Sequence, residues 1–185
     1  MCKLPDKIQA KNKTQLKRLI DYAFKHNIYD LNFIDTSKIT NMSNLFMNCE
    51  YDIDVSNWDV SNVTTTFCMF VGCKKFNSDL SNWNMANVKT TKYMFSGCKS
   101  FEGKGLENWN VSNVSDMTSM FAFCNKFDCD LSNWDVSNVT GMYFMFGHCK
   151  QFNCDLSCWN TSKVKDMKDM FTGCNRLTIP DWYKK

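Results

Sequence analysis

The stretch Phe127–Cys149, FDCDLSNWDVSNVTGMYFMFGHC, contains one complete copy of a unit that recurs along this 185-residue chain. Its tryptophan belongs to a series of anchor positions separated by 24, 25, 26, 25 and 25 residues. A phenylalanine lies twelve residues after every anchor and a cysteine fifteen residues after it. Such self-similarity predicts stacked repeats, because a unit this small cannot bury its own apolar face. The anchors are Ile34, Trp58, Trp83, Trp109, Trp134 and Trp159.

The apolar spacing changes within each repeat. Trp134 and Val136 alternate with polar residues, which favours a short strand. Residues 142–149 place apolar side chains at the i, i+3, i+4, i+7 spacing of a helical face, which favours a short helix. The sequence therefore predicts an α/β solenoid of about six strand-plus-short-helix coils.

Segments of different character flank the repeats. Residues 14–26 carry apolar side chains at helical spacing after Thr14, a candidate N-cap, and predict an amphipathic helix that covers one end of the stack. Leu177, Ile179 and Trp182 imitate the start of a seventh copy that Pro180 interrupts. We accordingly divide the chain into an N-terminal amphipathic capping helix in 1–30, a repeat solenoid over 31–177 and a C-terminal cap or tail over 178–185.

Charge and hydropathy narrow the class of protein. The net charge is +3, but residues 31–185 carry fifteen basic against sixteen acidic side chains. A neutral repeat region is unlike a nucleic-acid-binding surface, which concentrates Lys and Arg on one face. The N-terminus lacks the apolar run of a secretory signal, and no stretch reaches the ~18 apolar residues of a membrane span. We expect a cytoplasmic monomer with no nucleic-acid partner and no membrane insertion.

The chain has eleven cysteines, six of them at the repeated position after the anchors. One thiol per coil forms a line, whereas metal ligands must converge on one point. We predict a column of buried, reduced thiols and neither metal nor cofactor. A thiol-based metal or redox protein is the competing interpretation. Cys129 and Cys154 occupy equivalent positions in neighbouring copies, and the sequence leaves open whether they pair. No catalytic motif is present, so we expect no enzyme activity.

The unit at Phe127–Cys149 resembles the BspA-like leucine-rich repeats, which include the repeat of about 25 residues found in mycoplasma lipoproteins. The Leu-x-x-Trp-x-Val series is similar to the Leu-x-x-Leu-x-Leu framework of that family, and Met145-Phe146-x-x-Cys149 is similar to its Ala-Phe-x-x-Cys segment. The resemblance implies a leucine-rich-repeat-like stack. It also implies surface exposure, adhesion and partner binding, although this chain shows no export signal.

Two sets of positions are candidates for partner binding. The first contains side chains nine and ten residues after the anchors, where copies differ and aromatics occur without a repeat requirement. The second is a polar stripe, one residue after each tryptophan, which alternatively forms hydrogen bonds along the stack. The first set is Phe67, Lys92, Tyr93, Tyr143 and Phe144; the second is Asp59, Asn84, Asn110, Asp135 and Asn160.

These features predict a non-enzymatic, protein-binding or adhesin-like scaffold. The alternative is a structural or assembly component of a larger particle or surface layer. The sequence names no partner for either function.

Overall fold

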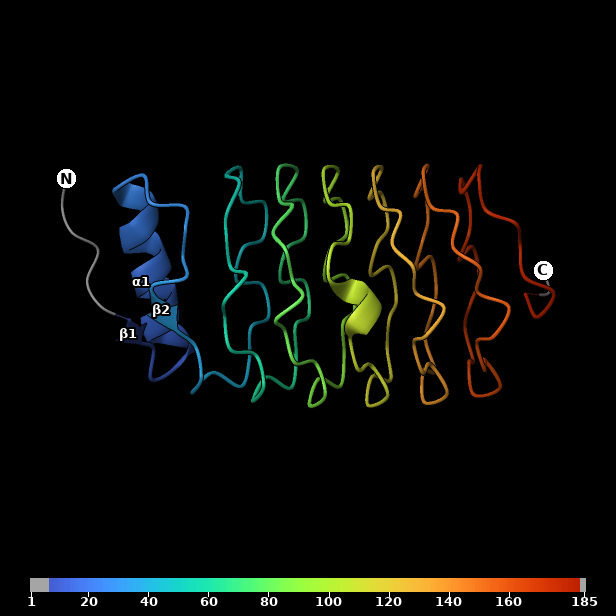
Figure 1. Cartoon of the computed structure of the whole chain (residues 1–185), viewed down its shortest axis with the longest axis horizontal. Coiled ribbons are helices and arrows are strands. Elements are labelled where there is room, and N and C mark those ends of the chain that lie inside the picture. Colours follow the sequence, from blue (N-terminus) through green and yellow to red (C-terminus); the bar gives the residue numbers. More distant parts are fainter. Residues whose placement is uncertain (1–6, 184–185) are drawn as a thin grey trace.

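The computed structural model describes residues 7–183. In chain order it contains β1 (Ile8–Gln9), α1 (Lys13–Lys25), β2 (Ile34–Asp35) and a 3-10 helix, η1 (Leu106–Asn108). Strands β1 and β2 pair in parallel, with Ile8 opposite Ile34. Successive repeats lie side by side along the longest axis of the molecule (Figure 1). Isolated parallel bridges link them, from Asn41–Thr65 through to Gly141–Asp166.

The predicted α/β solenoid of strand-plus-short-helix coils with a capping helix is wrong. Within residues 7–183, α1 is the one α-helix, and the two strands have only two residues each. The repeats are instead built from turns. We refer to them as repeats 1 to 6, numbered by their anchors from Ile34 to Trp159.

Tandem turns replace the predicted short helix. In repeat 2 the amide of Met69 donates to the carbonyl of Thr66, and Cys73 donates to Phe70. The third residue of each turn, Cys68 or Gly72, has positive φ, as in a type II turn. Because the two turns are four residues apart, they bring the same positions inward as a helical face would. Alternate amides of these turns, such as those of Cys68 and Phe70, donate to carbonyls of repeat 3. In a helix, these amides would instead donate to carbonyls of the same helix.

Turns also replace the predicted strands. The amide of Trp134 donates to the Leu131 carbonyl at 3.1 Å, and Val139 donates to Val136 at 2.9 Å. Each turn directs its apolar ends inward, so Trp134 and Val136 are both buried as the alternation predicted. Alternating burial therefore results from consecutive turns and not from a pleated strand.

Columns of identical side chains fill the interior. The rings of Phe95 and Phe121 stack at a centroid distance of 5.8 Å, and those of Trp83 and Trp109 stack at 6.2 Å. Each indole donates to a carbonyl of the preceding repeat, as Trp109 does to Leu80 at 3.1 Å. The predicted burial of the cysteine column is confirmed for the repeats after the first, whereas Cys49 is half-buried. The buried thiols are those of Cys73, Cys98, Cys124, Cys149 and Cys174.

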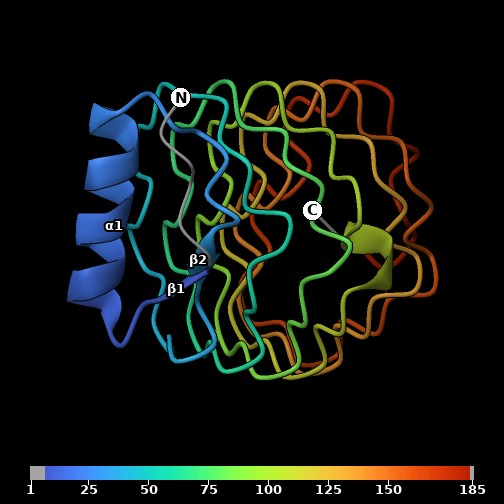
Figure 2. The same cartoon turned by 60° about the vertical axis from the view of Figure 1, so that its left-hand side comes forward.

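The two ends of the stack differ. Helix α1 lies against repeat 1 (Figure 2), and its buried face includes Leu16, Ile20 and Ala23. Its N-cap is Asn12, whose side chain accepts from the Gln15 amide at 2.9 Å, and not Thr14. At the other end Trp182 extends the tryptophan column, stacking on Trp159 at 6.3 Å. Residues 1–6 of the predicted N-terminal segment and 184–185 of the tail lie outside the described residues.

Candidate functional site

The polar stripe consists of exposed side chains that cap their own turns. The Oδ1 atom of Asp59 accepts from the Ser61 amide at 2.9 Å, and that of Asp135 accepts from Ser137 at 3.0 Å. Hydrogen bonding by the Ser137 side chain, together with its backbone amide, lowers the pKa of Asp135. Asn84, Asn110 and Asn160 accept from the amide two residues ahead in the same way. The stripe is thus accessible, but these oxygens already have a structural task.

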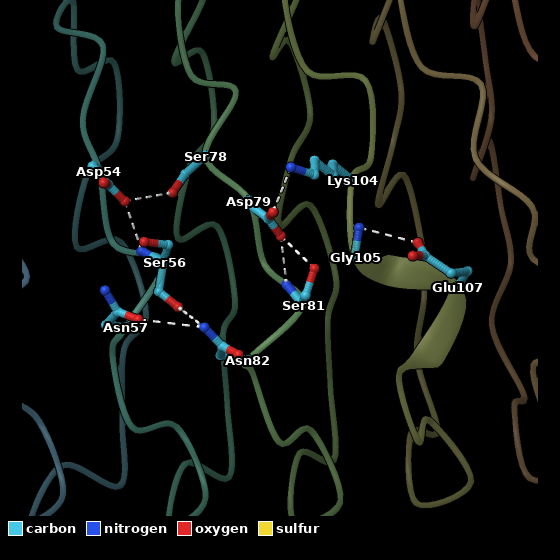
Figure 3. Close-up of polar contacts among 10 residues, drawn as sticks. All are labelled: Asp54, Ser56, Asn57, Ser78, Asp79, Ser81, Asn82, Lys104, Gly105 and Glu107. Atoms are coloured by element: carbon cyan, nitrogen blue, oxygen red, sulfur yellow. Dashed lines mark hydrogen bonds and ion pairs between the residues drawn. The ribbon is translucent and has the colours of Figure 1, made fainter.

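A second polar series lies before the tryptophans (Figure 3). Asp54 and Asp79 accept from the amides two residues ahead, and Ser78 of the next repeat donates to Asp54 at 3.1 Å. Lys104 lies 2.7 Å from Asp79. This contact, with donation from Ser81, lowers the pKa of Asp79 to about 2. These contacts fix loops and connect neighbouring repeats.

The turn face carries the other candidates. Phe67 and Tyr93 are half-buried and meet edge to face, with ring centroids 6.2 Å apart. Lys92 lies 5.5 Å from the Tyr93 ring centroid and 3.6 Å from the Asp116 carboxylate. The structure therefore pairs three of the candidates in repeats 2 and 3, where they cover part of each other's surface.

A larger aromatic group occupies repeats 4 and 5. Phe123, Tyr143, Phe144 and His148 form what we call the aromatic cluster. Phe123 stacks on His148 at 5.0 Å and contacts Phe144 at 5.6 Å, while Tyr143 lies 6.0 Å from Phe144. Phe123 is 46% exposed and Tyr143 38% exposed. The structure thus unites Tyr143 and Phe144 with two residues that were absent from the predicted set.

Phe123 and His148 are unusual for their position in the repeat, although positive φ also occurs at other non-glycine residues such as Tyr93 and Phe144. Phe123 and His148 lie fourteen residues after their anchors, at the third position of the second turn, with φ of 62° and 60°. The same position is Asn48, Gly72, Gly97 or Gly173 in the other repeats. Glycine and asparagine tolerate the left-handed region, whereas a bulky residue there is strained by about 1–2 kcal/mol. Such strain is commonly found at binding and catalytic sites.

The sequence contained a signal for these two residues. A column that otherwise holds only Gly or Asn is broken by aromatic rings in two adjacent repeats. The helix prediction hid this signal. A residue fourteen positions after the anchor would lie inside the predicted helix, where positive φ is not required. Gly147 belongs to the same site, since a Cβ atom there would collide with the Phe144 ring.

The ten cysteines of the described residues are free, and Cys2 lies outside that range. Burial raises the pKa of Cys174 to about 11 and that of Cys129 to about 12, the latter with the help of Glu107. Cys129 and Cys154 contact different carboxylates, those of Glu107 and Asp130. Within residues 7–183 no three His, Cys, Asp or Glu side chains converge as metal ligands. Cys129 and Cys154 line one shared pocket as free thiols.

The stacked repeats define this chain as a repeat protein. The chain belongs to the family described as Mycoplasma protein of unknown function, DUF285, whose model matches residues 14–105 and 101–183. No curated protein and no solved structure matches it. Over the described part of the chain, no helix has both the length and the apolar character that crossing a membrane requires.

Proposed function

We propose that this chain binds another protein through the aromatic cluster, with the stacked repeats as a rigid support. The observation that carries the proposal is the pair Phe123 and His148. These rings stand partly exposed, in adjacent repeats, at positions where the fold favours glycine. A strained conformation that contributes nothing to the core is consistent with a binding role.

The chemistry of the cluster favours a protein partner. Aromatic rings provide large contact areas at little conformational cost and are enriched at the centres of protein interfaces. The phenol of Tyr143 and the imidazole of His148 add hydrogen-bonding groups at the edge of an apolar patch. The near-neutral charge of residues 31–185 favours a protein partner over nucleic acid.

The likeness of the repeat unit to BspA-like leucine-rich repeats supports the same proposal at the level of sequence. Surface exposure and adhesion follow from that likeness alone and are part of the proposal. The assembly alternative has less support, because α1 lies against repeat 1 and opposes head-to-tail growth there.

A double variant, Phe123→Gly with His148→Gly, tests the proposal. Glycine is the residue that three other repeats carry at this position, so the change removes both rings and relieves strain. We expect an unchanged or higher melting temperature together with loss of partners captured from extracts of the native cell. Quantitative mass spectrometry of the captured proteins measures the loss.

Asn48→Gly provides the matched control, because it makes the same type of change at the same turn position in repeat 1. Its captured proteins should equal those of the natural chain. If the double variant retains every specifically captured protein, the partner binds elsewhere and the proposal fails. If the double variant instead melts at a much lower temperature, the rings serve stability and the argument from strain fails.

A further inference from the structure

The turn face carries a backbone ladder with a fixed direction. In each of repeats 1 to 5, four alternate amides of the tandem turns donate to carbonyls of the following repeat, at N···O distances of 2.7–3.3 Å. In repeat 5, for example, Phe144 donates to Lys168 at 3.0 Å and His148 donates to Thr172 at 2.7 Å. Each repeat thus shows donors toward the C-terminal end of the stack and acceptors toward the N-terminal end.

Repeat 6 has the same donors without acceptors. Within residues 7–183, no backbone or side-chain oxygen accepts from the amides of Met167, Asp169, Phe171 or Gly173. These four amides, which we call the donor edge, correspond to the four that repeat 5 uses. Unpaired donors in a row at an open edge are a template for another extended chain.

A cleft of about 770 Å³ lies along the donor edge. Its walls include the apolar side chains of Phe171, Ile179 and Tyr183, and Ile179 is 44% exposed. Lys168 and Asp169 supply both signs of charge. Residues 178–183 cover the tryptophan half of repeat 6, where Trp182 donates to the Leu156 carbonyl at 2.8 Å. No carbonyl of these six residues accepts from the donor edge.

We propose that the donor edge binds an extended segment of a partner protein, which adds its backbone carbonyls to the ladder as a seventh turn segment would. The Tyr183 ring already contacts Phe171 edge to face at a centroid distance of 5.0 Å. The occupant presents carbonyls at alternate residues and an aromatic ring that replaces Tyr183 on Phe171, because the phenylalanine column is spaced at about 5.4–5.8 Å in the repeats before it. Main-chain hydrogen bonds provide the affinity in this mode of recognition, and side-chain pockets provide the specificity.

A second copy of the chain fits this edge less well. Two donor edges that face one another place amides against amides, so they form no hydrogen bonds. At the complementary acceptor edge of a second copy, the Lys13 amine of α1 already binds the Ser43 carbonyl. The donor-to-acceptor direction of the ladder therefore favours a segment of a different protein over a second copy.

Amide exchange with a synthetic peptide tests this inference. The peptide KVKDMKDMFTG, copied from residues 163–173, carries the carbonyls that repeat 5 already binds. In the free protein, the four donor-edge amides should exchange rapidly, and their equivalents in repeat 5 should be protected. Saturating peptide should slow exchange at the donor edge by about tenfold or more. No change at millimolar peptide would overturn the proposal.

Three variants and a dilution series complete the test. Ile179→Asp in the protein, or Phe171→Ala in the peptide, should reduce the protection, because each removes an apolar contact of the cleft. Tyr22→Ser, an exposed aromatic change on α1 at the opposite end, should leave it intact. Equal protection with the Phe171→Ala peptide would refute the aromatic requirement. Protection that rises with protein concentration in the absence of peptide would assign the edge to a second copy and refute the foreign segment.

Discussion

Truncation of Trp109 to alanine should destabilise the chain far more than truncation at the end of the same column. Trp109 is 4% exposed and stacks between Trp83 at 6.2 Å and Trp134 at 6.4 Å. A buried Trp→Ala change costs about 3–5 kcal/mol. The Leu80 carbonyl loses the indole donor but still accepts from the Trp83 amide at 3.1 Å, so it is not left unpaired. We therefore expect a loss of about 3–5 kcal/mol, which lowers the melting temperature of a chain this long by about 6–20 °C.

Urea unfolding followed by circular dichroism measures this loss, and amide exchange shows whether it reaches neighbouring repeats. Trp182→Ala is the matched comparison, because Trp182 is half-buried and continues the column on only one side. It should cost about 2 kcal/mol. If Trp109→Ala costs less than about 1 kcal/mol, or no more than Trp182→Ala, the columns do not hold the repeats together and the reasoning fails.

Two further predictions concern ionisable groups. In timed iodoacetamide labelling of the folded protein, exposed Cys158 should react first. Cys124 should resist labelling until the chain unfolds, because burial raises the pKa of its thiol and blocks access of the reagent. Equal labelling rates for the two thiols would contradict the buried column. Lys104→Ala should raise the pKa of Asp79 from about 2 toward its ordinary 3.8, as measured by NMR titration of the carboxyl group. Because the folded-state pKa of Asp79 is depressed, the stabilisation that Asp79 provides is fully present above about pH 4 and is lost as the pH falls through about 2. The stability of the Lys104→Ala variant should therefore depend less on pH in that window. An unchanged Asp79 pKa would refute the role given to Lys104.

The sequence was sufficient for the inward-facing positions because packing alone enforces them. The anchor tryptophans and the cysteines after repeat 1 are buried, as their recurrence predicted. The secondary structure of the repeats could not be predicted in the same way. Two turns four residues apart place Met145, Phe146 and Cys149 inward at the same spacing as a helix, so periodicity could not distinguish the two.

The candidate site was predictable only in part. Tyr143 and Phe144 were selected because they break the repeat pattern, and their role in binding stays a prediction. Phe123 and His148 were not selected, because their significance depends on positive φ, which a helix would not have required. The polar stripe was correctly placed on the surface, but its oxygen atoms are bound to amides two residues ahead.

The sequence by itself determined the period of the repeats and the identity of the buried columns. These depend on which side chains avoid water, and that property is local to each residue. Only the tertiary structure decided between helix and turn and brought Phe123 beside His148. It also left four amides of repeat 6 without acceptors among residues 7–183. The reason is that each of these features depends on the backbone of a neighbouring repeat about 25 residues away, and hydrogen-bond partners at that distance are fixed only when the repeats stack.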